Sequence, residues 1–431
     1  MYKRLNGFVI FFLLISLAFS ALQSCKSRSG GRTGSRGDGN NDGVVRGIKY
    51  TAPGSMNQPD NLVYVPTGSF VVNPQNGTSG RTNGIEQSIT VNGFWIDAYE
   101  VTNSQYHQFV NWVRDSIAAF ELNYYKVSKD GDTTIDWGKA RKINYQDEKI
   151  QERLSRLFLP EEERFMNRVE LDPKALVYRM SGYDFEAAVR NPGMNRNNFF
   201  YTYDIPVYPD TLVWVKDFAY SSNENMVKNY FSHPAYMHYP VVGVSQRMAM
   251  AYAHWRTRYM NEFLTKKKLV GAEYRLPTEA EWQLAAAGGH KSYLYPWGNY
   301  LKNDKDCMMA NFKNGRGDYA EDGALYPARV DSYFPNDYGI YNIVGNVAEW
   351  TVSNYIDDPN AFQHDFNPEI NLKPTPSSAR QHKRKVTRGG SWKDPASMIQ
   401  LNSRAYDYMD SARSYIGFRC VIDLPPGVKI N

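Results

Sequence analysis

The chain has 431 residues, of which 42% are hydrophobic and 14% aromatic, a composition that supports a folded core and excludes an intrinsically disordered protein. Lysine and arginine number 50 against 45 aspartates and glutamates, and both signs are interspersed along the chain. This balance does not indicate nucleic-acid binding, which requires a clustered basic face.

The first predicted element is a lipoprotein signal peptide at residues 1–24. Two basic residues precede an apolar run at 8–19, which is shorter than the roughly 20 residues that a transmembrane helix requires. The run leads to Leu-Gln-Ser-Cys at 22–25, which resembles a bacterial lipobox, in which the cysteine is acylated. We therefore predict lipidation of Cys25. The alternative is an ordinary cleaved signal followed by an incidental cysteine.

Residues 25–55 are predicted to form a lipidated, flexible tether. From 26 to 47 the chain is dominated by Gly, Ser, Arg, Asn and Asp, so it lacks the apolar side chains that a core needs. Lys26, Ser27 and Arg28 follow the cysteine, without the acidic cluster that resembles a surface-export tag in some diderm bacteria. These features predict an outer-membrane lipid anchor on the periplasmic face.

The folded part is predicted to begin with strands and one helix. Alternating apolar residues indicate strands at 62–65, 68–71 and 89–96. Thr102 and Gln105 then have the spacing of a capping box, and apolar residues follow at helical spacing. The sequence therefore predicts a strand that leads into an amphipathic helix.

A long insertion is predicted at about 121–237. Its composition changes to tyrosine-rich, charged sequence with irregular periodicity, and residues 153–168 have the composition of a charged helix. No group of residues with recognisable chemistry occurs there. Long insertions in compact domains tend to be functional or to bind partners.

Order is predicted to resume at 239–245, followed by a helix whose apolar residues share one face. These are Met248, Ala251, Tyr252, Trp255 and Tyr259. Thr278 and Glu281 form a second capping box, and Gly288 supplies the C-terminal stop. Beyond 298 the chain is rich in Gly, Asn, Asp, Pro and aromatic residues, which predicts a loop-rich half held by aromatic packing.

Seven segments together resemble the formylglycine-generating enzyme, or sulfatase-modifying factor, family. In chain order they are residues 94–103, 239–245, 275–282, 295–298, 339–350, 388–392 and 417–420. The resemblance implies an α+β fold of the irregular, loop-rich, C-type-lectin-like kind. The domain would span 56–425, carry the insertion at about 121–237 and end before a tail at 426–431.

The catalytic cysteine pair of that family is absent from this sequence. Active members hold copper with two cysteines shortly after a Gly-Gly-Ser-aromatic turn, and the corresponding positions here are Asp394 and Ile399. Soft thiolates suit Cu(I), so their loss removes the reason for copper binding. Cys307 and Cys420 lie elsewhere, and the sequence does not decide whether they pair. We expect a pseudoenzyme without copper or oxidase activity.

The same resemblance implies structural Ca²⁺. The first site would use Asn342, Glu349 and the carbonyls of Gly345 and Val347. A second, weaker site would use Asn311 and Asp322 with the carbonyls of Phe312 and Ala324. Hard oxygen ligands are those that calcium takes. The alternative is that these groups satisfy loop amides without an ion.

Three further segments, at 109–118, 208–215 and 229–236, resemble more narrowly the lipoproteins of gliding motility and type IX secretion. Two of them lie inside the insertion. The resemblance implies a non-catalytic, homo-oligomeric structural lipoprotein that forms a periplasmic ring under the outer membrane with a soluble partner subunit. Two alternatives stay open: a module that binds envelope glycans or peptidoglycan, and an enzyme that uses carboxylates such as Glu349 or Asp394.

Overall fold

The computed structural model describes most of residues 61–423. The gaps are 73–86, 130, 132, 165–167, 220–221, 267–272, 292, 316–318, 358–363 and 375–377. The predicted signal (1–24), tether (25–55) and tail (426–431) lie outside the described residues. All of the described residues belong to one compact unit, residues 46–430. No helix among its described residues has the length and apolar composition needed to cross a bilayer.

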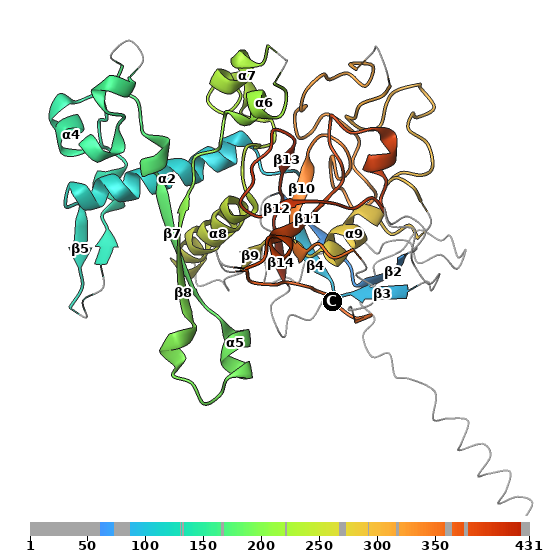
Figure 1. Cartoon of the computed structure of the whole chain (residues 1–431), viewed down its shortest axis with the longest axis horizontal. Coiled ribbons are helices and arrows are strands. Elements are labelled where there is room, and N and C mark those ends of the chain that lie inside the picture. Colours follow the sequence, from blue (N-terminus) through green and yellow to red (C-terminus); the bar gives the residue numbers. More distant parts are fainter. Residues whose placement is uncertain are drawn as a thin grey trace, which may run out of the picture. The chain divides into compact units, whose positions relative to one another are not determined.

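Two four-stranded sheets form the centre of this unit (Figure 1). The first has the antiparallel order β1 (Leu62–Val65), β4 (Phe94–Asp97), β14 (Val421–Asp423), β9 (Tyr274–Arg275). The second has the order β12 (Ala405–Tyr408), β11 (Arg384–Arg388), β10 (Ala348–Asn354), β13 (Ile416–Gly417), with β10 and β13 parallel. Because β14 pairs with β4, the two ends of the described chain close on each other.

Three two-stranded ribbons and three longer helices complete the scaffold. The ribbons are β2 (Gly68–Val72) with β3 (Gln87–Val91), β5 (Tyr125–Val127) with β6 (Thr133–Ile135), and β7 (Val177–Tyr183) with β8 (Phe200–Pro206). The helices are α2 (Asn103–Glu121), α8 (Gln246–Lys266) and α9 (Glu279–Ala287). Separate helices beside mainly antiparallel strands confirm the α+β class.

The helix boundaries follow the capping signals of the sequence. Thr102 and Gln105 form a capping box at the start of α2, and Thr278 and Glu281 form one at the start of α9. Gly288 ends α9 with a φ of +59°, a left-handed conformation that glycine adopts without strain. Both predicted capping boxes are therefore confirmed.

Aromatic residues of α2 and α8 fill the larger core. Tyr106 stacks on Tyr252 at 5.6 Å between ring centroids, and Phe109 lies 5.2 Å from Trp255. The predicted inner face of α8 is buried except for Tyr259, the member nearest the C-terminal end of the helix, which is 40% exposed. A second core surrounds the fully buried Trp282 of α9.

The insertion is built from short elements. The helices are α3 (Trp137–Ala140), α4 (Glu148–Arg153), α5 (Phe185–Arg190), α6 (Val213–Lys216) and α7 (Glu224–Asn229). The ribbon β7–β8 packs on α8, and its far end carries α5 (Figure 1).

Two local predictions were wrong. The charged helix expected at 153–168 does not form: α4 ends at Arg153, and 3-10 turns follow at Ser155–Leu157 and Glu161–Glu163. Pro160 cannot continue an α-helix, and the buried side chains around it favour compact turns. The single strand expected at 89–96 is divided into β3 and β4 by a break at residues 92–93.

Candidate functional site

The loop between residues 339 and 347 contains a cluster of left-handed backbone conformations. Asn342, Gly345 and Asn346 have φ values of +47°, +75° and +53°. Asparagine and glycine are the residues that adopt this region most readily. The resulting turns direct the two asparagine side chains into the protein, where Asn342 is 5% and Asn346 0% exposed.

These asparagines converge on the buried carboxylate of Glu100, in the segment between β4 and α2. Asn346 Nδ2 donates to Glu100 Oε1 at 2.8 Å, and Asn342 Nδ2 lies 3.4 Å from Oε2. Asn311 Nδ2 in turn donates to Asn346 Oδ1 at 3.2 Å. Burial raises the pKa of Glu100 to about 8, against the lowering effect of Arg419. Burial therefore makes the charged form of the Glu100 carboxyl group unfavourable unless a cation lies beside it.

Glu349, which the sequence offered as the calcium carboxylate, is engaged elsewhere. Arg419 Nε donates to both of its oxygens at 2.9 and 2.8 Å, and Trp282 Nε1 donates to Oε2 at 2.8 Å. All three side chains are buried. The carboxylate that the fold brings to Asn342 is therefore Glu100. Sequence reasoning missed it because it lies 242 residues away, although it belongs to the matched segment 94–103.

The donor chemistry of the first predicted site fits a hard cation. The Oδ1 atom of Asn342 is buried and has no hydrogen-bond partner among the described residues. Leaving a buried acceptor unpaired costs about 1–3 kcal/mol, and calcium takes amide and carboxylate oxygens as ligands. Asn342 and Glu100, with the predicted carbonyls of Gly345 and Val347, would hold the ion and join two parts of the chain.

The second predicted site has a different arrangement. The backbone N–H groups of Phe312 and Ala324 donate to Asp322 at 2.7 and 3.2 Å, so these residues present amide hydrogens to the carboxylate. Burial raises the pKa of Asp322. Among the side-chain oxygens of this second site, only Oδ1 of Asn311 has no hydrogen-bond partner in the described residues. Because backbone amides already bind Asp322, the geometry favours the alternative in which these groups satisfy loop amides without an ion. Within the described residues, no group of three His, Cys, Asp or Glu side chains could hold a metal.

Calcium binding at the first site stays a prediction with a direct test. Adding millimolar calcium to chelator-stripped protein is expected to stabilise it by about 1 kcal/mol, the effect of a ligand at a few times its Kd. Glu100→Gln is expected to abolish both the melting shift and the heat of binding in calorimetry. Asp322→Asn is the matched control and should leave both intact. Absence of heat and of a melting shift in the unaltered protein would exclude the site.

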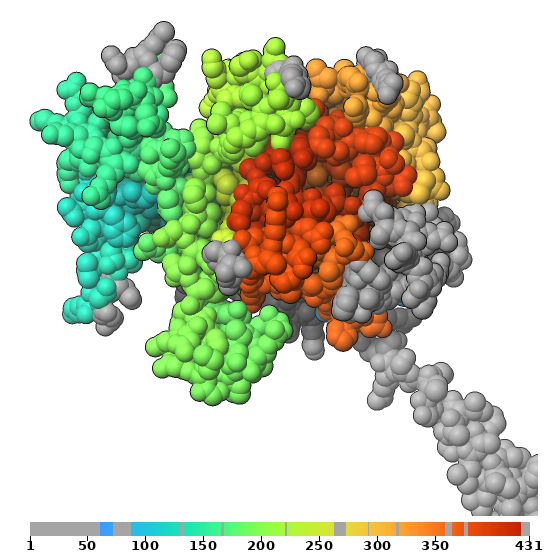
Figure 2. Space-filling view, in the orientation of Figure 1, coloured from blue at the N-terminus to red at the C-terminus, as the bar shows by residue number. Residues whose placement is uncertain are grey.

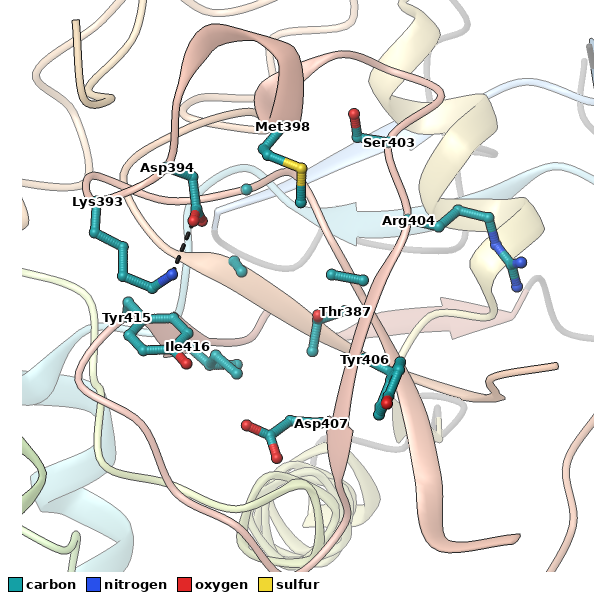
Figure 3. Close-up of a pocket in the computed structure, with 13 residues that line it drawn as sticks. Thr387, Lys393, Asp394, Met398, Ser403, Arg404, Tyr406, Asp407, Tyr415 and Ile416 are labelled. Atoms are coloured by element: carbon teal, nitrogen blue, oxygen red, sulfur yellow. Dashed lines mark hydrogen bonds and ion pairs between the residues drawn. The ribbon is translucent and has the colours of Figure 1, made fainter. Parts of the chain in front are cut away.

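A cavity of about 150 Å³ lies beside Asp394 (Figure 3). Asp394 accepts from Ser391 Oγ at 2.6 Å and pairs with Lys393 Nζ at 2.8 Å. Lys393 also lies 4.0 Å above the ring of Tyr415. Asp407, on the opposite wall, pairs with Arg413 at 2.6 Å. Figure 2 shows the C-terminal segment, coloured red, gathered on the face in view. The charged side chains of Asp394 and Asp407, which line the cavity, are therefore already paired within the chain.

The residues at the two positions that the resemblance implies for the catalytic cysteines do not fit copper. Asp394 offers a hard oxygen ligand, and Ile399 is a fully buried hydrocarbon in the second core. Cys307 is exposed, Cys420 is buried, and both are free thiols. Burial raises the pKa of Cys420 to about 12, so this thiol stays protonated at neutral pH. The donor set therefore gives no basis for a copper centre.

Comparisons with known proteins agree with the segments identified above. The family model described as the sulfatase-modifying factor enzyme 1-like domain matches residues 49–424. The protein named inactive C-alpha-formylglycine-generating enzyme 2 of Bos taurus is 35% identical over 199 residues, 44% of this chain and 53% of that protein. The chain thus matches about half the length of this relative.

Two other matches cover more of both chains. The formylglycine-generating enzyme of Mus musculus is 28% identical over 390 residues, 87% of this chain and 80% of that protein. Among solved structures, PvdO from Pseudomonas aeruginosa aligns over 87% of this chain and 99% of its own, with 18% identity and a TM-score of 0.45.

Proposed function

We propose that this chain, which belongs to the sulfatase-modifying factor family, is a non-catalytic structural lipoprotein. What supports the proposal is the chemistry at the two positions that the resemblance implies for the copper-binding cysteines: a paired carboxylate, Asp394, and a buried isoleucine, Ile399. The matched relatives include proteins named as inactive formylglycine-generating enzymes, from Bos taurus and Mus musculus. A member without catalysis is therefore compatible with the family.

The same geometry argues against residual catalysis through carboxylates. Glu349 is fully buried and bound by Arg419, so no substrate can reach it. Asp394 lines a cavity, but both of its oxygens are engaged by Ser391 and Lys393. Neither residue has a free acid or base partner beside it, which general acid–base catalysis requires.

The narrower resemblance supports a role in type IX secretion and gliding motility, as a lipoprotein similar to the GldK/PorK group. Two of the three supporting segments lie in the insertion, and there they form its attachment to the scaffold. Trp214 of α6 is 1% exposed and stacks 6.2 Å from Trp392 of the scaffold. Tyr230 donates its hydroxyl to the carbonyl of Pro240 at 2.7 Å. These contacts make the insertion a fixed part of the body, able to present a constant surface to other subunits.

In this role the chain would be acylated at Cys25 and held on the periplasmic face of the outer membrane. Copies would assemble into a ring with a soluble periplasmic partner subunit, as the resemblance implies. An inert domain suits such a task, because a ring subunit needs rigid and repeated contacts and does not need turnover.

The test is the native mass and composition of the protein extracted in mild detergent from its own membrane. Large rings with a stoichiometric partner are expected, and Cys25→Ser should release the chain from the membrane fraction. Single copies without a partner would contradict the ring. Single copies that co-sediment with peptidoglycan would favour the glycan-binding alternative, for which a cavity of about 320 Å³ lined by Tyr236, Tyr239 and Tyr326 offers aromatic surfaces.

A further inference from the structure

The ribbon β7–β8 ends in a tip, residues 184–200, that carries an exposed apolar surface. Phe185 is 75%, Val189 79% and Phe200 65% exposed, the three largest values for large hydrophobic side chains in the described part of the chain. Phe185 and Val189 are one helical turn apart and share a side of α5. Met194, 51% exposed, adds to the patch. Figures 1 and 2 show the tip as a separate green lobe.

The tip is held in place and is not a loop that could fold back over its own apolar groups. The ring of Tyr183 contacts those of Phe185 and Phe200 at 4.8 and 4.9 Å. Asp184 caps α5 by accepting from the backbone N–H of Ala187, and it pairs with Lys373 Nζ of the scaffold at 2.8 Å. The apolar side chains are therefore presented permanently to the surroundings.

Exposed apolar groups that are rigidly held mark an interaction surface. This one is a protrusion that carries Arg190 and Arg196 and contacts Lys373 of the scaffold. Arg190 pairs with Glu186, and Lys373 pairs with Asp184. Arg196 makes no ion pair with any described residue. A convex apolar surface with cations at its rim matches the boundary between phospholipid headgroups and acyl chains, where aromatic and aliphatic residues insert and arginine meets phosphate.

The length of the chain before the described part agrees with such a contact. Thirty-five residues, 26–60, separate Cys25 from Asn61, and a chain of that length reaches at most about 115–125 Å. A body held within this reach meets its bilayer at high effective concentration, which strengthens an apolar contact that the unacylated body also makes by itself.

We propose that the tip of the β7–β8 ribbon docks on the phospholipid bilayer to which the chain is anchored. The proposal rests on the lipid anchor of the proposed function. It gives the body a second point of contact, which would fix its orientation on the membrane and keep successive copies of a ring in one plane.

The test is flotation of the mature chain carrying Cys25→Ser, which cannot be acylated, with vesicles of phosphatidylethanolamine and phosphatidylglycerol. The unacylated chain is expected to float with the vesicles. Phe185→Ser/Val189→Ser is expected to reduce its partition coefficient about tenfold or more, since two apolar side chains no longer leave water. Leu325→Ser/Phe334→Ser, at exposed apolar positions away from the tip, is the matched control and should float like the parent.

Several results would overturn the proposal. One is a parent chain that stays in solution, and another is a tip variant that floats as well as the control. Self-association that depends on Phe185 and Val189 without flotation would assign the tip to a second copy of the chain. Acylation and ring formation are measured on the unaltered protein, so failure of the scaffold proposal is recognised separately.

Discussion

Replacing Arg419 with methionine is expected to lower the free energy of unfolding by about 3–5 kcal/mol, the cost of breaking a buried ion pair from one side. Arg419 is 0% exposed and pairs with Glu349 at 2.7 Å. It also donates to the carbonyls of Asp97 at 3.0 Å and Tyr341 at 2.9 Å. One guanidinium therefore joins β4, β10 and the asparagine-rich loop. Its removal leaves a buried carboxylate and two carbonyl oxygens without their partner.

Denaturant unfolding of Arg419→Met and of a matched control decides this prediction. The control is Arg190→Met, which removes the exposed pair with Glu186, whose side chains are 74% and 60% exposed. Exposed pairs contribute about 0–1 kcal/mol, so this variant should unfold almost like the parent. A loss for Arg419→Met no larger than that of the control would show that the buried pair does not hold the three segments together.

Gly345→Ala is expected to cost about 2–5 kcal/mol, the sum of a left-handed backbone penalty and a steric clash. Gly345 has a φ of +75°, and a Cβ atom there would strike the carbonyl oxygen of Asn311. That oxygen belongs to the backbone and accepts from Asn346 N at 2.8 Å. Neither side of the contact can move without breaking the loop. The variant is therefore expected to melt at a lower temperature and to lose any calcium response.

The matched control is Gly289→Ala. Gly289 also has a positive φ, +89°, but the nearest atom to a new Cβ would be the hydroxyl oxygen of Tyr338 at 3.4 Å, an ordinary contact. This variant should cost only the conformational penalty, about 1–2 kcal/mol. Thermal unfolding measures both. Equal losses would mean that the close approach of residues 311 and 345 does not constrain the loop.

The candidate site shows how far a sequence can predict buried chemistry. The sequence identified Asn342 and Asn311, and the structure finds an unpaired amide oxygen on each of them. It did not identify Glu100 as the carboxylate beside Asn342. Glu349 lies nearer to Asn342 along the chain and is equally acidic, but it forms an ion pair with Arg419. The partner of a buried charge depends on which distant segments meet, and spacing in the sequence does not report this.

The sequence by itself determined features that depend on neighbouring residues. The capping boxes at Thr102 and Thr278 and the buried face of α8 were predicted because hydrogen bonds and helical periodicity act over three or four residues.

Only the tertiary structure decided features that depend on contacts between distant segments. The pairing of β14 with β4, the partners of Glu100 and Glu349, and the replacement of the expected helix at 153–168 by turns belong to this group. The exposed tip at 184–200 does too, because its apolar residues could equally have filled a core. Burial is a property of the whole fold, since a side chain leaves water only when other segments cover it.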